Sequence, residues 1–146
     1  MSTFGRWEYT CDQDATSKAY AQIERGGSDS CTCNGCRNFA AARDKVFTGE
    51  FLSLLASLGI DSRKDAEVYH NGKLAPGCHD YGGWFHFMGT LELTGDFPMV
   101  PMGNDFSACM LRRCAPTLPG LEGRPLVQVE FHASNVPWVL NEPEEL

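Results

Sequence analysis

The hydrophobic period of this chain changes once, near residue 60, and that change limits the folds open to it. Before residue 60, four apolar residues follow the i, i+3, i+4, i+7 spacing of an amphipathic helix: Phe51, Leu54, Leu55 and Leu58. After it, apolar and polar residues alternate as they do in half-buried strands. Helices followed by strands predict an α+β fold with a mainly antiparallel sheet.

Two helices are predicted before the change of period, at about 38–47 and 49–58. Three apolar residues of the first share one face: Phe39, Ala42 and Val46. Thr48 suits the N-cap of the second helix, and Gly59 suits the left-handed position that follows a helix. The stretch 12–30 has an irregular pattern and is expected to form no helix. We expect the two helices to pack on one face of the sheet.

Strand signals dominate the second half of the chain. The Asn71-Gly72 pair has the residues of a tight type I′ hairpin turn. Alternating runs at 83–93 and 126–132 predict two long strands. The side chains of His86 and His132 fall on the faces of these strands that point away from the helices.

Length and composition predict one domain. At 146 residues, of which 42% are apolar, the chain is long enough to bury a single hydrophobic core. No linker, repeat or low-complexity tract divides it, so we predict a single domain over 1–146. Its last six residues, 141–146, are acidic and are expected to fray.

The net charge of −7 restricts the partners. Residues 61–146 carry twelve acidic against six basic side chains. A negative field repels phosphate backbones and anionic lipids, so neither nucleic acid nor a membrane is an expected partner. A metal cation, a protein partner or a homodimer suits the chain better. The N-terminus has no signal-peptide stretch, and the longest apolar run is too short to span a bilayer, which predicts a cytoplasmic location.

Three of the seven cysteines lie within six residues, in the run C-T-C-N-G-C: Cys31, Cys33 and Cys36. In a reducing compartment such thiols are free or bind metal rather than form a disulfide framework. Cys33-x-x-Cys36 has the spacing of half a zinc site, and Cys31 would add a third ligand. Zinc prefers four ligands, and we consider these residues for the fourth, with Cys11 first: Cys11, Cys78, His70, His79 and His132.

Two other interpretations of the cluster stay open. A helix that starts near residue 37, together with Arg37, would lower the pKa of a nearby thiol and suit a redox dithiol. The residues upstream, however, lack the βαβ pattern of a thioredoxin-like site. Free cysteine is also among the most buried residue types, so the three thiols could simply pack a loop against the core.

No complete catalytic set is identified, and no residue is assigned a catalytic or organic-cofactor role. The chain has no phosphate-binding loop, no G-x-S-x-G and no H-E-x-x-H. His86 and His132 would meet if their strands were neighbours, and such a pair could bind a metal or transfer protons.

Four segments carry a resemblance: C-T-C-N-G-C-R-N-F, L-G-I-D-S-R-K-D-A-E-V-Y, Y-G-G-W-F-H-F-M-G and P-W-V-L-N-E-P. In that order the chain resembles a family of small uncharacterised bacterial proteins with no known activity. The resemblance spans most of residues 31–143. It implies a bacterial, cytosolic origin and a shared single-domain fold.

The leading hypothesis is a non-enzymatic protein-interaction module, of the inhibitor or immunity type, whose cysteine cluster holds zinc. The alternative is a small metal- or thiol-dependent enzyme that uses Cys33 and Cys36 together with His86 or His132.

Overall fold

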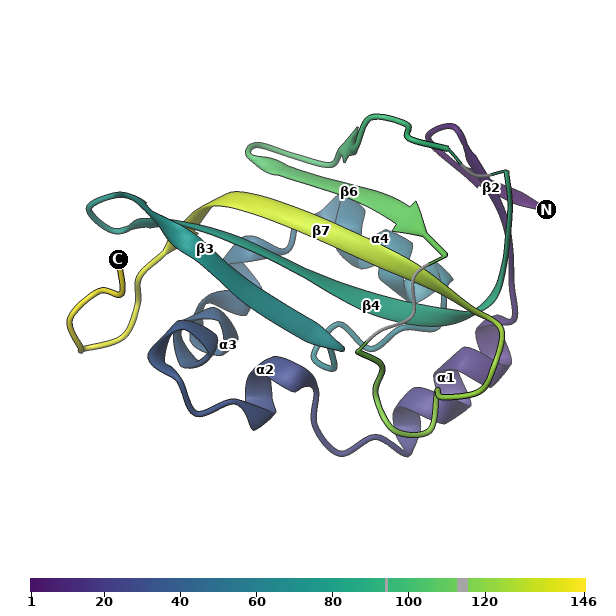
Figure 1. Ribbon diagram of the computed structural model, residues 1–146, viewed down its shortest axis with the longest axis horizontal. Coiled ribbons are helices and arrows are strands. Elements are labelled where there is room, and N and C mark those ends of the chain that lie inside the picture. The colour runs from purple at the N-terminus through teal and green to yellow at the C-terminus, as the bar shows by residue number, and fades with distance from the viewer. Residues whose placement is uncertain (94, 113–115) are drawn as a thin grey trace.

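In the computed structural model, a seven-stranded antiparallel sheet crosses the molecule and four helices accompany it (Figure 1). The structure describes residues 1–93, 95–112 and 116–146, and these counts refer to those residues. The strands are β1 (Ser2–Phe4), β2 (Trp7–Cys11), β3 (Glu67–Ala75), β4 (Cys78–Leu93), β5 (Val100–Pro101), β6 (Phe106–Leu111) and β7 (Leu126–Pro137). The helices are α1 (Gln13–Ala21), α2 (Gly27–Ser30), α3 (Asn34–Val46) and α4 (Gly49–Ser57). The predicted α+β class with a mainly antiparallel sheet is confirmed.

The long strand β4 organises the sheet. Its first half pairs with β3 and its second half with β2, so that these two strands follow one another along the same edge. Its other edge pairs with β7, which is followed by β6 and β5. Phe85 lies opposite Val129 and Phe87 opposite Val127, and all four side chains are fully buried. The alternation predicted for these two strands therefore identifies the core face correctly.

Aromatic side chains hold two of the helices on this face. Phe39 of α3 stacks on Phe131 of β7, with ring centroids 5.8 Å apart. Phe51 of α4 meets Phe106 of β6 at 4.9 Å. In Figure 1, α3 and α4 lie behind the sheet. Burial of these rings supplies a large hydrophobic contribution and also fixes how the helices pack.

The number of helices differs from the prediction, and α3 begins earlier than expected. Two helices were expected, at about 38–47 and 49–58, whereas four are present in the described ranges. α3 starts at Asn34 because the Cys33 sulfur accepts the backbone N–H of Cys36, a capping role usually filled by Ser, Thr, Asp or Asn. None of the described helices is both long and apolar enough to span a membrane.

Helix α1 lies in the stretch that was expected to be irregular. The Asp12 carboxylate caps it by accepting the N–H of Ala15 at 3.0 Å. Only two of its residues are buried, Thr16 and Tyr20, so its sequence shows no clear apolar stripe. Tertiary contacts hold it in place instead, since the Tyr20 hydroxyl donates to the backbone carbonyl of His86 at 2.7 Å.

Helix α4 follows the prediction closely. The Thr48 hydroxyl accepts the N–H of Phe51 at 3.2 Å and so caps the first turn. Gly59 ends the helix with a φ of +80°, and the N–H of Ile60 reaches back to the carbonyl of Leu55 at 2.9 Å.

The hairpin turn between β3 and β4 is not at Asn71-Gly72. Ala75 pairs with Cys78, so Pro76-Gly77 forms the turn, and Gly77 has a φ of +74° that suits glycine. Asn71-Gly72 instead lies inside β3, where the register shifts. The turn predicted at Asn71-Gly72 is therefore wrong. Pro76-Gly77, five residues later, also has turn-forming residues, and it is this pair that lies between the paired residues Ala75 and Cys78.

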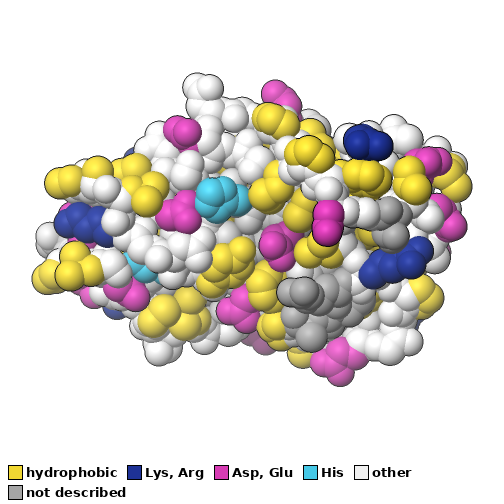
Figure 2. All heavy atoms as spheres, turned by 45° about the horizontal axis from the view of Figure 1, so that its top comes forward, with side chains coloured by type: hydrophobic (Ala, Val, Ile, Leu, Met, Phe, Trp, Pro, Cys, Tyr) yellow, Lys and Arg dark blue, Asp and Glu magenta, His cyan; other side chains and the backbone are white. Residues whose placement is uncertain are grey.

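The sheet face turned away from the helices is not left bare. The indole N–H of Trp84 donates to the carbonyl of Pro116 at 3.1 Å, so the loop after β6 reaches this face. On the surface in Figure 2, hydrophobic side chains are interspersed with acidic groups. Among the described residues, the exposed large apolar side chains are far apart in the chain: Met1, Leu52, Leu74, Leu93, Val139 and Leu146.

Candidate metal centre

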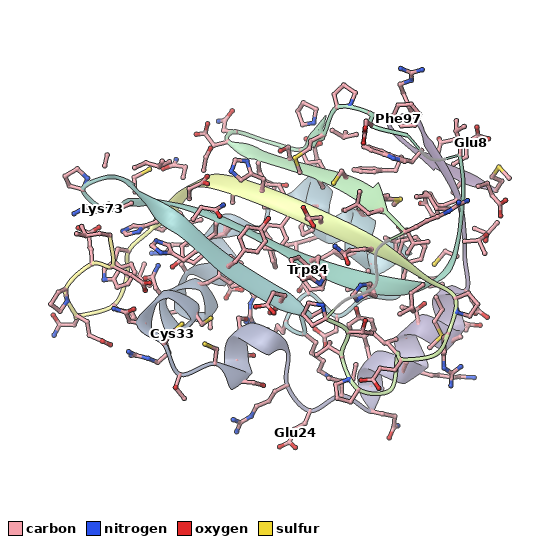
Figure 3. All side chains as sticks on the ribbon, in the orientation of Figure 1. Glu8, Glu24, Cys33, Lys73, Trp84 and Phe97 are labelled. Atoms are coloured by element: carbon pink, nitrogen blue, oxygen red, sulfur yellow. The ribbon has the colours of Figure 1, made fainter. Side chains whose placement is uncertain are left out.

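The three cysteines of the C-T-C-N-G-C run lie where α2 ends and α3 begins. Cys31 follows the last residue of α2, Cys33 is the N-cap of α3, and Cys36 lies in its first turn. In Figure 3, Cys33 lies at the start of α3, near the outside of the molecule. Cys33 is exposed, while the other two are partly buried.

The three thiols converge. The sulfurs of Cys31 and Cys33 are 3.2 Å apart, and the ligand atoms of all three residues lie within 4.8 Å of one another. The Cys33 sulfur also accepts the backbone N–H of Cys36 at 3.4 Å. The short helix α2 and the start of α3 therefore aim three sulfurs at one region.

The local electrostatics differ between the thiols. Hydrogen bonds lower the pKa of Cys31, and the largest effect comes from the backbone N–H of Cys33. Burial raises the pKa of Cys36. The N-terminus of α3 places partial positive charge beside the cluster.

The spacing suits a single soft metal ion. Zinc binds thiolate at about 2.3 Å, so two sulfurs at adjacent tetrahedral positions lie roughly 3.8 Å apart. Three sulfurs within 4.8 Å of one another are close to that arrangement. Three thiolates leave one tetrahedral position open, and thiolate donors favour zinc or monovalent copper over magnesium and calcium.

Cys11, the first choice for a fourth ligand, lies elsewhere. Its backbone pairs with Gly89 in the sheet, and its thiol donates to the carbonyl of Leu58 at 3.5 Å. Burial raises the pKa of Cys11 to about 11. Cys78 points to the carbonyl of Ser134 instead. In the described part of the chain, the group of side chains close enough to hold a metal ion consists of Cys31, Cys33 and Cys36.

His86 and His132 do not meet. Although β4 and β7 are neighbours, His86 lies opposite Gln128, whereas His132 lies opposite Gly82, four residues from His86 along β4. The His86 ring was expected to point outward, but it is fully buried. Its Nε2 is hydrogen-bonded to the side-chain oxygen of Gln128 at 3.0 Å. The register of β4 and β7 thus keeps apart the two histidines that were expected to meet if their strands were neighbours.

Another group of histidines was underestimated from the sequence. His70 and His79 appeared there only as separate candidates for a fourth zinc ligand. In the structure their rings are hydrogen-bonded to each other at 2.9 Å, and His79 also contacts the side chain of Glu144, 65 residues away. No local residue spacing in the sequence predicts this group, because its members come from two strands and the C-terminal segment.

No family model, no curated protein and no solved structure matches this chain. The functional argument therefore depends on the geometry of the sites themselves.

Proposed function

We propose that this chain is a non-enzymatic protein-interaction module that binds one zinc ion through Cys31, Cys33 and Cys36. The observation that supports zinc binding most directly is the convergence of three sulfurs within 4.8 Å of one another at the start of α3. Bound zinc would tie the end of α2 to the first turn of α3, and it would hold this exposed loop in one conformation.

The open fourth position supports the interaction role. With Cys11 directed to Leu58, the described residues supply three close ligands, and the exposed Cys33 faces solvent. A cysteine or histidine of a protein partner, or of a second copy of the chain, would complete the tetrahedron. The net charge of −7 favours a partner with a basic surface.

Zinc content per chain tests the proposal. Cys33→Ser removes a thiolate but keeps a hydroxyl that caps helices well, so it separates loss of metal from loss of fold. We expect wild-type protein, purified without chelator, to carry about one zinc per chain by elemental analysis, and Cys33→Ser to carry none. Cys78→Ser is the matched control, because that thiol lies outside the cluster, and it should retain the metal.

The same experiment distinguishes the alternatives. Equal zinc in wild type and Cys33→Ser would contradict the proposed ligands. Protein without metal that loses two thiols on mild oxidation would indicate a redox site. Metal-free protein with unreactive thiols would indicate packing alone. The enzyme alternative is not favoured by the geometry, because among the described residues no histidine belongs to the group of converging side chains that contains Cys33 and Cys36.

A further inference from the structure

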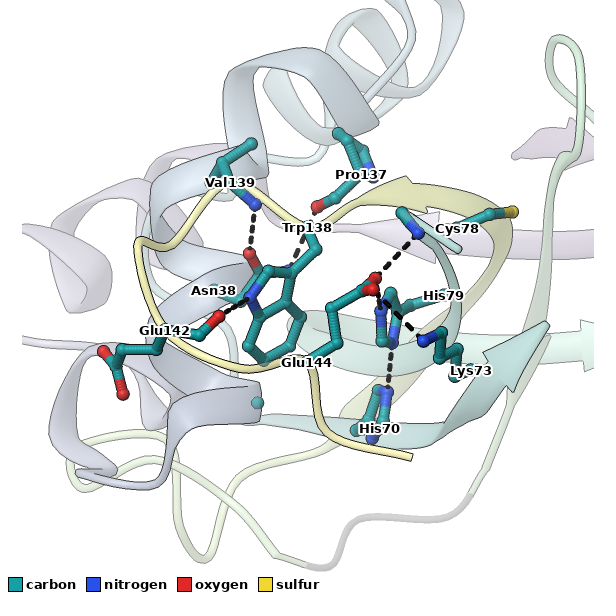
Figure 4. Close-up of polar contacts among 12 residues, drawn as sticks. Asn38, His70, Lys73, Cys78, His79, Pro137, Trp138, Val139, Glu142 and Glu144 are labelled. Atoms are coloured by element: carbon teal, nitrogen blue, oxygen red, sulfur yellow. Dashed lines mark hydrogen bonds and ion pairs between the residues drawn. The ribbon is translucent and has the colours of Figure 1, made fainter. Parts of the chain in front are cut away.

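The carboxylate of Glu144 is held by three donors from one β-hairpin (Figure 4). One of its oxygens accepts the backbone N–H of Gly77 at 2.7 Å and lies 2.9 Å from Nε2 of His79. The other lies 3.1 Å from Nζ of Lys73. A backbone N–H, an imidazole and an ammonium group thus converge on a single carboxylate, which is the pattern of a binding site for that group.

Two of the three donors, His79 and Gly77, are held in place by packing and by the hairpin turn. His79 is fully buried, with Trp138 packed against its ring at a centroid distance of 4.9 Å. Its Nδ1 faces Nε2 of His70 at 2.9 Å. When Nδ1 of His79 accepts a hydrogen bond from Nε2–H of His70, the hydrogen of the His79 ring is on Nε2 and points to Glu144, so His70 orients His79. The Gly77 N–H is fixed by the hairpin turn.

The C-terminal segment that supplies Glu144, by contrast, has no regular secondary structure. Residues 138–146, which include the end expected to fray, form no helix or strand. Leu146 is 89% exposed. Within the described chain, one carboxylate oxygen of Glu145 is buried without a hydrogen-bond partner, which costs free energy. Binding of the chain's own tail at this site therefore carries a free-energy cost, and a different peptide need not have that cost.

Two further glutamates of the tail also face basic or imidazole side chains. Glu142 pairs with Arg37 of α3 at 2.9 Å, and Glu145 lies 3.7 Å from Nδ1 of His70. Three acidic side chains within four residues thus meet donors on α3, β3 and β4. This surface matches an acidic segment rather than an isolated anion.

We propose that Lys73, Gly77 and His79, flanked by Arg37 and His70, form a binding site for an acidic peptide. In this state the chain's own residues 142–145 occupy it and act as an intramolecular competitor. The ligand class is a glutamate-rich segment of a partner protein, with one glutamate carboxylate in the position of Glu144. Its attraction comes from the local cations Arg37 and Lys73, whereas the net charge of −7 concerns the surface as a whole. The site does not include the cysteines, although Arg37, which flanks it, directly follows Cys36 and donates to the carbonyl of Thr32 at 3.0 Å.

The test uses the full chain with a neutralised tail, E142A/E144A/E145A, and a synthetic peptide N-E-P-E-E-L that copies residues 141–146. The matched control is E24A/E50A/E122A, which makes the same change in net charge at three exposed glutamates. Binding is followed by NMR, through the Gly77 amide and the His79 ring nitrogens. Because a tethered competitor acts at high effective concentration, we expect the peptide to bind the tail variant at least about tenfold more tightly than wild type or control.

A second peptide, N-E-P-Q-E-L, lacks the carboxylate that corresponds to Glu144 and should bind the tail variant markedly more weakly. Equal affinity for wild type, tail variant and control would overturn the proposal. So would a Gly77 amide that does not move on addition of peptide, or equal binding of the two peptides. If the triple variant does not fold, the single variant Glu144→Gln keeps the side-chain size and should still bind more tightly than wild type. Zinc content is measured separately, so failure here leaves the metal proposal unaffected, and the reverse holds as well.

Discussion

Two groups of residues differ in how they are assembled: the cysteine cluster, and the histidine–glutamate site formed by His70, His79 and Glu144. The cluster comes from six consecutive residues, and one of its thiols is exposed. The other site comes from β3, β4 and the C-terminal segment, and its central ring, His79, is fully buried. A local site can change with little effect on the rest of the fold, whereas a site made of distant segments also connects them. We therefore expect metal binding and stability to depend on different residues.

The largest effect on stability is expected at His79. His79→Ala removes a buried ring that contacts His70, Trp138 and Glu144, and it leaves a cavity and unpaired polar atoms. The free energy of unfolding should fall by about 2–4 kcal/mol, as measured by urea denaturation. The control is His132→Ala, whose ring is 42% exposed and bonded to Asp80. An equal loss in the two variants would contradict the contrast between buried and exposed sites.

A smaller loss is expected at Asn38, which anchors the start of the C-terminal segment to α3. Its side-chain carbonyl accepts the N–H of Val139 at 2.7 Å, and its amide donates to the carbonyl of Pro137 at 3.1 Å. Asn38→Ala should lower the free energy of unfolding by about 1–3 kcal/mol, because two backbone groups lose their partner. The exposed Asn104 provides the control, and Asn104→Ala should behave as wild type in the same urea titration.

The third largest effect is expected from acid, which should weaken the attachment of the C-terminal segment. The hydrogen bond from His79, followed by those from Gly77 and Lys73, lowers the pKa of Glu144 to about 2. Because the folded-state pKa lies below the ordinary value of 4.5, the stabilisation is complete above 4.5 and is lost as the pH falls toward 2. In urea titrations, wild type should exceed Glu144→Gln in stability at pH 6, and the difference should shrink as the pH falls through this range. A difference that does not change with pH would argue against a charged Glu144.

The smallest effect on the fold is expected at the cysteine cluster without metal. Cys33→Ser keeps the helix cap and changes a thiol that faces solvent. In chelator, its free energy of unfolding should lie within about 0.5 kcal/mol of the wild-type value. In zinc, only the wild type should gain stability, because the metal binds the folded state. A large loss in chelator would show that the thiols support the core rather than a metal.

The elements that could be predicted are those whose signal is local. The apolar spacing of Phe51 to Leu58 and the cap at Thr48 define α4, and the alternation of 126–132 defines most of β7. Helix α1 could not be predicted, since it buries only Thr16 and Tyr20 and is held by contacts to β4. The start of α3 was misplaced because cysteine is an unusual helix cap.

The candidate sites divide in the same way. Three cysteines within six residues remain close in any compact fold, so their sequence already indicates a metal site. His86 and His132 were linked by strand parity alone, but parity does not set the register, and the register keeps them apart.

The sequence by itself determined the α+β class, the helix at 49–57 and the grouping of Cys31, Cys33 and Cys36, because each depends on residues within a few positions of one another. Only the tertiary structure decided the partners of His79. A turn at Asn71-Gly72 would have placed His70 opposite Lys73, whereas the turn at Pro76-Gly77 pairs Lys73 with His79 and brings His70 beside it. Glu144 then reaches the same point from the far end of the chain, through packing that no local pattern encodes.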